Sequence, residues 1–192
     1  MLRLFTGIEI PLEQRDELVH LRRPLPGSSR WVEPENLHLT LRFAGDIEHQ
    51  RAEEFVDRLA GIDVDAFEMR LAGLGTFGGN EPRSIWAGVE AGPELEALQR
   101  ANERAARAAG LPPESRTFKA HVTVARVKYA SASEVARVLQ RIGAFRTQPF
   151  LVGRFVLFSS RPKVGGGPYV VEEAFPLRGG EFADYSDAEG GW

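Results

Sequence analysis

Two short segments of the chain alternate polar and apolar residues in the same way. Residues 38–41 read His-Leu-Thr-Leu, and residues 121–124 read His-Val-Thr-Val. Side chains on a β-strand point to opposite faces in turn, so each segment predicts a strand with its aliphatic residues on one face and its His and Thr on the other. The pattern therefore predicts two strands that each present one imidazole and one hydroxyl to a shared space.

The similarity extends beyond these segments when the chain is shifted by 83 residues. Apolar positions then coincide at the i, i+3, i+4, i+7 spacing of an amphipathic helix, in residues 48–60 and again in residues 131–142. An apolar run typical of a strand follows each helix. The match extends over about 40 residues and predicts two copies of one strand-helix-strand unit, at about 37–77 and 120–160. A period of 83 residues is too long for a solenoid repeat.

The rest of the chain predicts further elements separated by loops rich in Gly and Pro. Strands are expected at 2–10, 37–44, 67–74, 84–90, 117–128, 150–159 and 168–175, and helices at 12–21, 48–60, 93–109 and 131–142. Ser131 and Glu134 have the spacing of a capping box at the start of the last helix. We predict an α+β fold with two pseudo-symmetric lobes of mainly antiparallel sheet, flanked by helices, and an active-site cleft between the lobes.

Composition limits the domain organisation. The chain has 192 residues, of which 43% are hydrophobic and 27% are charged, as expected for a globular protein. We predict one bilobal domain over residues 1–177. Residues 178–192 are acidic and rich in Gly, and we expect them to form a disordered tail.

Charge and cysteine content narrow the classes of partner. The formal net charge is −3, whereas proteins that grip long nucleic acids are usually basic, so a nucleic-acid ligand would be handled at its terminus. No cysteine is present, so disulfides and thiolate chemistry are excluded. No apolar run reaches the roughly 20 residues of a membrane span, and the N-terminus lacks an apolar signal region. We expect a cytoplasmic protein with no membrane partner, and a monomer.

Two histidines on opposing strands suit a reaction in which a proton is removed at one point and delivered at another. A Thr hydroxyl beside each ring can donate to an anionic oxygen held between the rings, and a phosphate diester fits such a cradle. A single strand histidine is often a structural residue, but its recurrence in matched repeats favours a functional pair. A metal site is the other alternative, although no Cys, Asp or Glu lies within either segment to complete a ligand set.

The wider context resembles the two-histidine (2H) phosphoesterase superfamily, and within it the RNA 2′,3′-cyclic phosphodiesterase group, also described as 2′-5′ RNA ligase-like. Besides the two His-x-Thr-x segments, the matching stretches are 3–11, 31–43, 73–77, 118–126 and 158–169. The resemblance covers residues 1 to about 177. One position departs from the family pattern, because Ala120 precedes the second histidine where the family usually has Pro.

The resemblance implies hydrolysis of a terminal 2′,3′-cyclic phosphate, on RNA or a nucleotide, to a 2′-phosphate, without metal or cofactor. His38 would donate a proton to the departing 3′-oxygen and His121 would accept one from water. Thr40 and Thr123 would hold the phosphate. The reverse reaction, which joins a 2′,3′-cyclic end to a 5′-hydroxyl, would use the same groups.

Other residues are left with two interpretations. Arg42 shares the His38 face by alternation and can contact the phosphate, but an ion pair at the sheet surface explains it equally well. Arg126 should point to the opposite face of a regular strand, yet the resemblance makes it a phosphate contact, and a β-bulge would reconcile the two. Four aromatic residues are candidates for base stacking or for the core: Phe5, Trp31, Phe43 and Phe118.

Two alternatives to this function remain. The same chemistry can act on another small cyclic phosphate, such as that of ADP-ribose. The chain can also be a module that binds RNA ends without catalysis, although both His and both Thr are intact, which argues against that reading.

Overall fold

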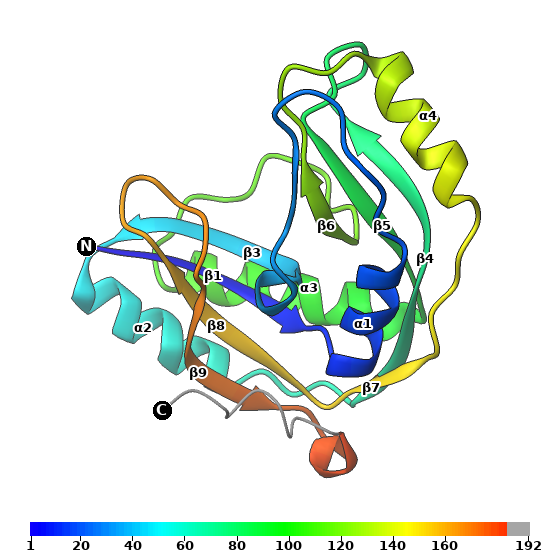
Figure 1. Cartoon of the computed structure of the whole chain (residues 1–192). Helices are drawn as coiled ribbons and strands as arrows, with labels where there is room; N and C mark the ends of the chain where they lie inside the picture. Colours follow the sequence, from blue (N-terminus) through cyan, green and yellow to red (C-terminus); the bar gives the residue numbers. More distant parts are fainter. Residues whose placement is uncertain (184–192) are drawn as a thin grey trace.

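A computed structural model of the chain describes residues 1–183 (Figure 1). The strands are β1 (Leu2–Glu9), β2 (Arg30–Trp31), β3 (His38–Ile47), β4 (Phe67–Phe77), β5 (Ser84–Ala91), β6 (His121–Arg126), β7 (Phe150–Val152), β8 (Arg154–Ser160) and β9 (Val170–Pro176). The helices are α1 (Leu12–His20), α2 (His49–Ala60), α3 (Pro93–Ala108) and α4 (Ala132–Ile142), with 3₁₀ turns η1 (Pro34–Asn36) and η2 (Gly180–Phe182). All four expected helices are present. Two strands were not expected separately: β2 has only two residues, and the run 150–159 divides into β7 and β8.

The strands form one curled sheet in the order β7-β4-β5-β6-β3-β1-β8-β9, with β2 on β6. Every pair of named strands within residues 1–183 is antiparallel. The two halves of the sheet meet where β3 pairs with β6 through Leu39 and Val122 alone. The α+β fold with two lobes of antiparallel sheet is thereby confirmed.

The two sequence repeats are exchanged between the halves of the sheet. The first repeat starts with β3 in one half and, after α2, ends with β4 in the other. The second repeat starts with β6 beside β5. After α4 and the short edge strand β7, it crosses to the half that contains β3 and continues there as β8. Each half therefore contains the histidine strand of one repeat and a later strand of the other.

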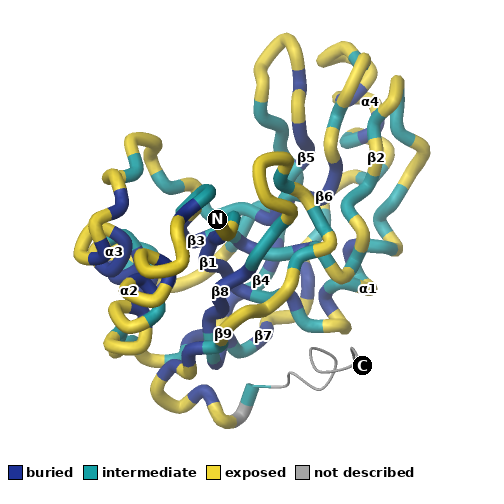
Figure 2. Tube along the Cα trace, turned by 90° about the vertical axis from the view of Figure 1, so that its left-hand side faces the viewer, coloured by how far each residue is buried: buried dark blue, intermediate teal, exposed yellow. Residues whose placement is uncertain are grey.

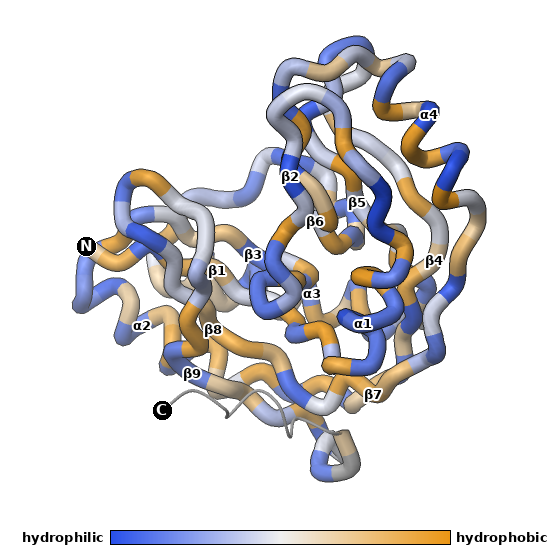
Figure 3. The backbone as a smooth tube through the Cα atoms, in the orientation of Figure 1, coloured by the Kyte–Doolittle hydropathy of each residue, from blue (hydrophilic) through white to orange (hydrophobic). Residues whose placement is uncertain are grey.

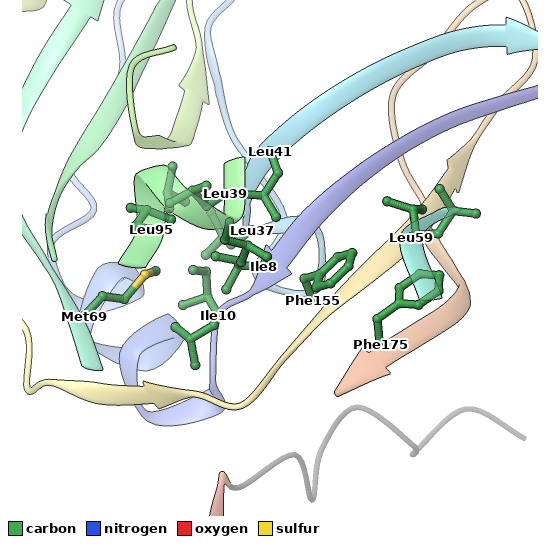
Figure 4. Close-up of a cluster of buried hydrophobic side chains, with 14 of the residues drawn as sticks. Ile8, Ile10, Leu37, Leu39, Leu41, Leu59, Met69, Leu95, Phe155 and Phe175 are labelled. Carbon is green, nitrogen blue, oxygen red and sulfur yellow. The ribbon is translucent and has the colours of Figure 1, made fainter. Parts of the chain in front are cut away.

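The main core lies on the face of the sheet opposite the histidines. Residues of α2 and α3 belong to the same buried cluster as Leu39 and Leu41 of β3, and Figure 4 shows Leu39 and Ile8 beside Leu95 of α3. Figure 2 shows buried residues concentrated along β1 and β8 and on α2 and α3. The apolar spacing found in the sequence is thus the side of each helix that packs on the sheet.

The capping box is formed as predicted. The Glu134 amide donates to the Ser131 hydroxyl over 3.2 Å, and the Ser131 amide donates to the Glu134 carboxylate over 2.8 Å. These two bonds satisfy amides that the first turn of α4 leaves without helical partners.

The predicted tail begins too early. Arg178 pairs with Asp63 and Asp65 over 2.8 and 2.7 Å, and η2 continues the folded chain to residue 182. The rest of the predicted tail, residues 184–192, lies outside the described residues. In the part of the chain that is described, no helix is both long and apolar enough to cross a lipid bilayer.

Candidate active site

β3 and β6 each contain a β-bulge just after the His-x-Thr segment. The register of β3 with β1 shifts between Thr40 and Arg42, and the register of β6 with β5 shifts between Thr123 and Ala125. An extra residue in one strand reverses the alternation of faces beyond it. Both strands consequently have the same burial sequence: half-buried His, buried aliphatic, half-buried Thr, two buried residues and one exposed residue.

The pairing of β3 with β6 brings the two segments together. Leu39 and Val122 are partners and are both fully buried on the core face. One step to either side, the antiparallel register places His38 beside Thr123 and Thr40 beside His121. The structure therefore unites all four residues that the sequence singled out, on one face and on two adjacent strands.

Each imidazole is oriented by the carbonyl two residues before it. His38 Nδ1 lies 2.8 Å from the Asn36 carbonyl oxygen, and His121 Nδ1 lies 2.6 Å from that of Lys119. A carbonyl only accepts, so Nδ1 carries the proton in both rings and Nε2 is the atom free to exchange one. The Thr40 hydroxyl lies 3.1 Å from His38 Nε2.

Aromatic rings surround both histidines. The His38 ring contacts Phe5 at 4.9 Å, Phe158 at 5.5 Å and Tyr169 at 4.9 Å between centroids. The His121 ring meets Phe77 edge-on at 4.9 Å and Trp86 at 6.4 Å. These rings fix the imidazoles and keep water from one side of each.

Burial lowers the pKa of both histidines. The pKa of His38 falls to about 4, chiefly because burial penalises the charged ring; the hydrogen bond to Asn36 opposes this, while the charges of Arg126 and His121 add to it. The pKa of His121 is lowered by burial first and then by the charges of Lys119 and Arg126, against the hydrogen bond to the Lys119 carbonyl. In the unliganded protein both rings are therefore neutral at pH 7.

The two candidate arginines have opposite placements. The bulge after Thr123 turns Arg126 to the histidine face, where its charge acts on both rings. The bulge after Thr40 turns Arg42 away from that face into the interior, where it is 6% exposed and donates to Glu103 and to the carbonyls of Phe43 and Pro112. The predicted contact of Arg42 with the phosphate is therefore wrong, because its guanidinium is committed inside the fold.

The four aromatic candidates differ in exposure and in their contacts. Phe5 is 4% exposed and packs on Phe158, so its ring supports His38 and has no face for a base. Phe118 packs against the main core. Phe43 is exposed, with the Arg3 guanidinium 5.1 Å from its ring. Trp31 is half-buried, and its indole nitrogen donates to the Arg23 carbonyl over 2.9 Å. Base stacking stays a prediction for Phe43 and Trp31.

Sequence reasoning assigned no role to several residues that shape the site. Asn36 and Lys119 occupy the same position in the two repeats, and the 83-residue shift that relates the histidines would have identified both. The side-chain oxygen of Asn36 also accepts from the Tyr169 amide over 3.2 Å, which connects His38 to the loop before β9. Phe77, Phe158 and Tyr169 lie in stretches that resemble the family, and Trp86 lies outside them. No pattern in the sequence linked these four rings to the histidines, which they reach through the pairing of the strands.

The set of donor atoms determines whether the site could hold a metal ion. Within residues 1–183, no three His, Cys, Asp or Glu side chains are grouped so that they could hold one. The groups that the site does offer are two imidazoles, two hydroxyls and the Arg126 guanidinium.

Comparison with known proteins gives consistent matches. The family described as LigT like Phosphoesterase matches residues 8–86 and 88–169. An RNA 2′,3′-cyclic phosphodiesterase of Aeropyrum pernix is 37% identical over 132 residues, 67% of this chain and 73% of its own. One from Thermus thermophilus is 33% identical over 189 residues, 93% of this chain and 91% of its own.

Solved structures agree on the fold. A crystal structure of a Thermus thermophilus protein has a TM-score of 0.76 and 28% identity over 92% of this chain and 98% of its own. The structure of E. coli LigT complexed with 3′-AMP has a TM-score of 0.75 and 24% identity, with the same coverage. The second match, at its lower identity, bears on the fold alone.

Proposed function

The chain belongs to the LigT-like phosphoesterase family and is a two-histidine phosphoesterase. We propose that it hydrolyses terminal 2′,3′-cyclic phosphates of RNA to 2′-phosphates. The observation that carries the proposal is the paired geometry of β3 and β6, which sets two Nδ1-protonated imidazoles and two hydroxyls on one face. The relatives named above act, by their names, on this kind of substrate.

In the proposed reaction the two histidines act on opposite sides of phosphorus. His121 Nε2 takes a proton from water as its oxygen forms a bond to phosphorus, and His38 Nε2 gives a proton to the 3′-oxygen as its bond to phosphorus breaks. The products are a 2′-phosphate and a free 3′-hydroxyl. The assignment of acid and base follows the family resemblance, because the geometry of the two rings is nearly the same.

Thr40, Thr123 and Arg126 stabilise the charge on the phosphate oxygens. The two hydroxyls lie beside the two rings, and Arg126 supplies a positive charge that acts on both of them. Thr40 is held by His38 Nε2 before substrate binds. Its hydroxyl must therefore turn from the ring to the phosphate when His38 becomes protonated.

Substrate binding favours protonation of His38, the proposed general acid. With a pKa of about 4, His38 is almost wholly neutral at pH 7 in the free protein. A bound phosphodiester anion favours the protonated form of both rings. The saturated rate should therefore persist to higher pH than kcat/KM does.

The same groups also determine the metal requirement, a possible ligation reaction and the alternative substrate. The reaction needs no metal, because acid, base and charge stabilisation all come from side chains. Ligation is a parallel displacement in which a 5′-hydroxyl replaces water: His121 takes the proton of the hydroxyl as its oxygen bonds to phosphorus, His38 gives a proton to the departing 3′-oxygen, and a 2′-5′ linkage forms. Another small cyclic phosphate, such as that of ADP-ribose, presents the same reacting atoms and is the alternative substrate.

Hydrolysis of a 2′,3′-cyclic mononucleotide in the presence of EDTA tests the proposal. We expect turnover that is unchanged by EDTA, and a ³¹P NMR spectrum that shows the 2′-phosphate as the only product. Formation of a 3′-phosphate would overturn the assigned leaving group. No turnover of cyclic nucleotide or ADP-ribose cyclic phosphate, together with binding of RNA ends, would show a non-catalytic module. Loss of activity in EDTA that zinc restores would favour metal chemistry.

A further inference from the structure

Two arginines face each other across the pairing of β2 with β6, next to the histidines. Arg30 is the direct partner of Arg126, and both side chains are exposed. Directly opposed residues of an antiparallel pair share a face, and like charges in that arrangement destabilise the sheet. Within residues 1–183 neither arginine has a carboxylate partner. An arrangement of this kind is stabilised by an anionic ligand.

A groove of about 580 Å³ is lined by Arg30 and by residues of the segment between α1 and β2. Its lining includes Arg22, Arg23, Trp31 and one acidic residue, Glu33. The Trp31 ring is fixed by the bond from its nitrogen to the Arg23 carbonyl, and the Arg22 guanidinium lies 5.8 Å from the ring centroid. Cations and an aromatic surface in one groove are the combination found in sites for single-stranded nucleic acid.

The basic surface continues onto α4. A second hollow of about 230 Å³ shares Pro24 and Leu25 with the groove and is lined by Arg137 and Arg141. Its one acidic residue, Glu134, is engaged in the capping box at the start of α4. Figure 3 shows hydrophilic residues on the segment before β2 and on α4, which approach each other beside β5 and β6.

We infer that this arginine groove, made of Arg22, Arg23, Arg30, Trp31, Arg137 and Arg141, binds the RNA strand on the 5′ side of the terminal nucleotide. The inference rests on the proposed function and specifies its substrate as an oligonucleotide. A 2′,3′-cyclic phosphate occupies the 3′ end of RNA, so the strand can leave the histidines only in the 5′ direction. Arg126 and Arg30 then contact successive phosphates, and the groove binds the nucleotides on their 5′ side.

The two related helices support this direction for the strand. The 83-residue shift places Arg137 and Arg141 of α4 on Glu54 and Arg58 of α2. The helix beside the groove therefore presents two arginines where its counterpart presents one acid and one base. In a chain with a net charge of −3, five arginines and two glutamates along one path are a local excess of positive charge.

The test compares two substrates that share the same terminal nucleotide: a cyclic mononucleotide and a ten-nucleotide single-stranded RNA with the same 2′,3′-cyclic end. We expect kcat/KM of the wild type to be at least tenfold higher for the oligonucleotide. The double variant Arg137→Gln/Arg141→Gln should lose about tenfold on the oligonucleotide and nothing on the mononucleotide. Its plot of log kcat/KM against log salt should be shallower by about 1.4, because each phosphate contact to a single strand contributes about 0.7.

A matched control is the double variant Arg51→Gln/Arg58→Gln, which removes the same charge from exposed positions of α2. It should keep the wild-type ratio of the two substrates and the wild-type salt slope. The inference is overturned if the control loses as much as the α4 variant, or if the wild type does not prefer the oligonucleotide.

A binding measurement separates this inference from the proposed function. If neither substrate is hydrolysed, the proposed function fails, and fluorescence anisotropy with a labelled ten-nucleotide RNA still tests the groove. Weaker binding by the α4 variant than by the α2 control supports the groove. Equal binding by both variants, or no binding by the wild type, overturns it.

Discussion

The strands β3 and β6 have the same backbone features around their histidines and differ in the side chains that follow. Both have a histidine held through Nδ1 by the carbonyl two residues earlier, a Thr two residues later, and then a bulge. After the bulge, β3 turns Arg42 inward and Phe43 outward, whereas β6 turns Ala125 inward and Arg126 outward. The backbone of the site is duplicated, but after the bulge only β6 turns an arginine outward.

The difference extends to the surroundings of the two rings. His38 lies among three aromatic rings and has the more strongly lowered pKa, while His121 has two aromatic neighbours and the Lys119 side chain, which lies over Trp86 at 4.3 Å. A symmetric backbone with asymmetric surroundings gives two histidines with different proton affinities. Acid and base chemistry needs that difference.

Removal of either imidazole should have the largest effect on activity. We expect His38→Ala and His121→Ala each to lower kcat for a cyclic mononucleotide by about 10²- to 10⁴-fold, because general acid and general base contributions are of that size. Circular dichroism and thermal unfolding serve as the control and should show a folded chain. Wild-type turnover in either variant would contradict the two-histidine mechanism.

Replacement of Arg42 should act on folding and not on chemistry. Arg42→Gln removes the cationic partner of Glu103, whose carboxylate keeps the bond from the Glu114 amide, and breaking a buried pair costs about 3 kcal/mol of the free energy of unfolding. Urea unfolding measures the loss. Arg100→Gln, which removes an exposed pair with Glu96 on α3, is the control and should cost less than about 0.5 kcal/mol. A stable Arg42→Gln protein with weakened substrate binding would restore its role at the phosphate.

Replacement of Arg126 should have the opposite outcome. Arg126→Gln removes the charge that acts on both rings, so kcat/KM should fall about 10²-fold, as for loss of one donor to a developing anion. Its side chain is exposed, so the free energy of unfolding should change by less than about 0.5 kcal/mol. Arg104→Gln on α3 is a control of equal charge. If Arg126→Gln kept full activity, the phosphate would need another partner.

Arg42 and Arg126 show where strand alternation stops predicting the face to which a side chain points. Alternation correctly placed His38, Thr40, His121 and Thr123, because the bulges come after them. Beyond the bulges alternation fails, and a bulge depends on the pairing with a neighbouring strand, which no local pattern reports. For that reason Arg42 was assigned to the wrong face, and Arg126 was placed correctly only through the family resemblance.

The same limit applies to the fold. Periodicity identified the helices and the main strands, since each is a local pattern of burial. The exchange of β4 and β8 between the halves of the sheet was not predicted, because the sequence repeat shows which units are alike and not where each unit pairs. The rings of Phe158 and Tyr169 reach His38 only through that exchange, by way of β8 and the loop that follows it.

The smallest expected effect concerns the order in which the histidines titrate. His38 has the lower pKa in the free protein, so a singly protonated site carries its proton mostly on His121, whereas the reaction needs it on His38. A bell-shaped kcat/KM should then have an acidic limb that mainly reports His38 and an alkaline limb that mainly reports His121. Because the pKa of His121 is lowered from 6.5, the alkaline limb should lie below pH 6.5.

Lys119 distinguishes the two limbs, because its charge lowers the pKa of His121 and is not among the causes of the shift at His38. Lys119→Gln removes that charge but keeps the carbonyl that orients the ring, so the pKa of His121 should rise. We expect the alkaline limb of kcat/KM to move to higher pH while the acidic limb stays in place. Arg126→Gln should move both limbs upward, because Arg126 lowers the pKa of both rings. Lys128→Gln, beside Tyr129, should move neither. Movement of the acidic limb alone in Lys119→Gln would reverse the order of the two histidines and place the lower pKa on His121.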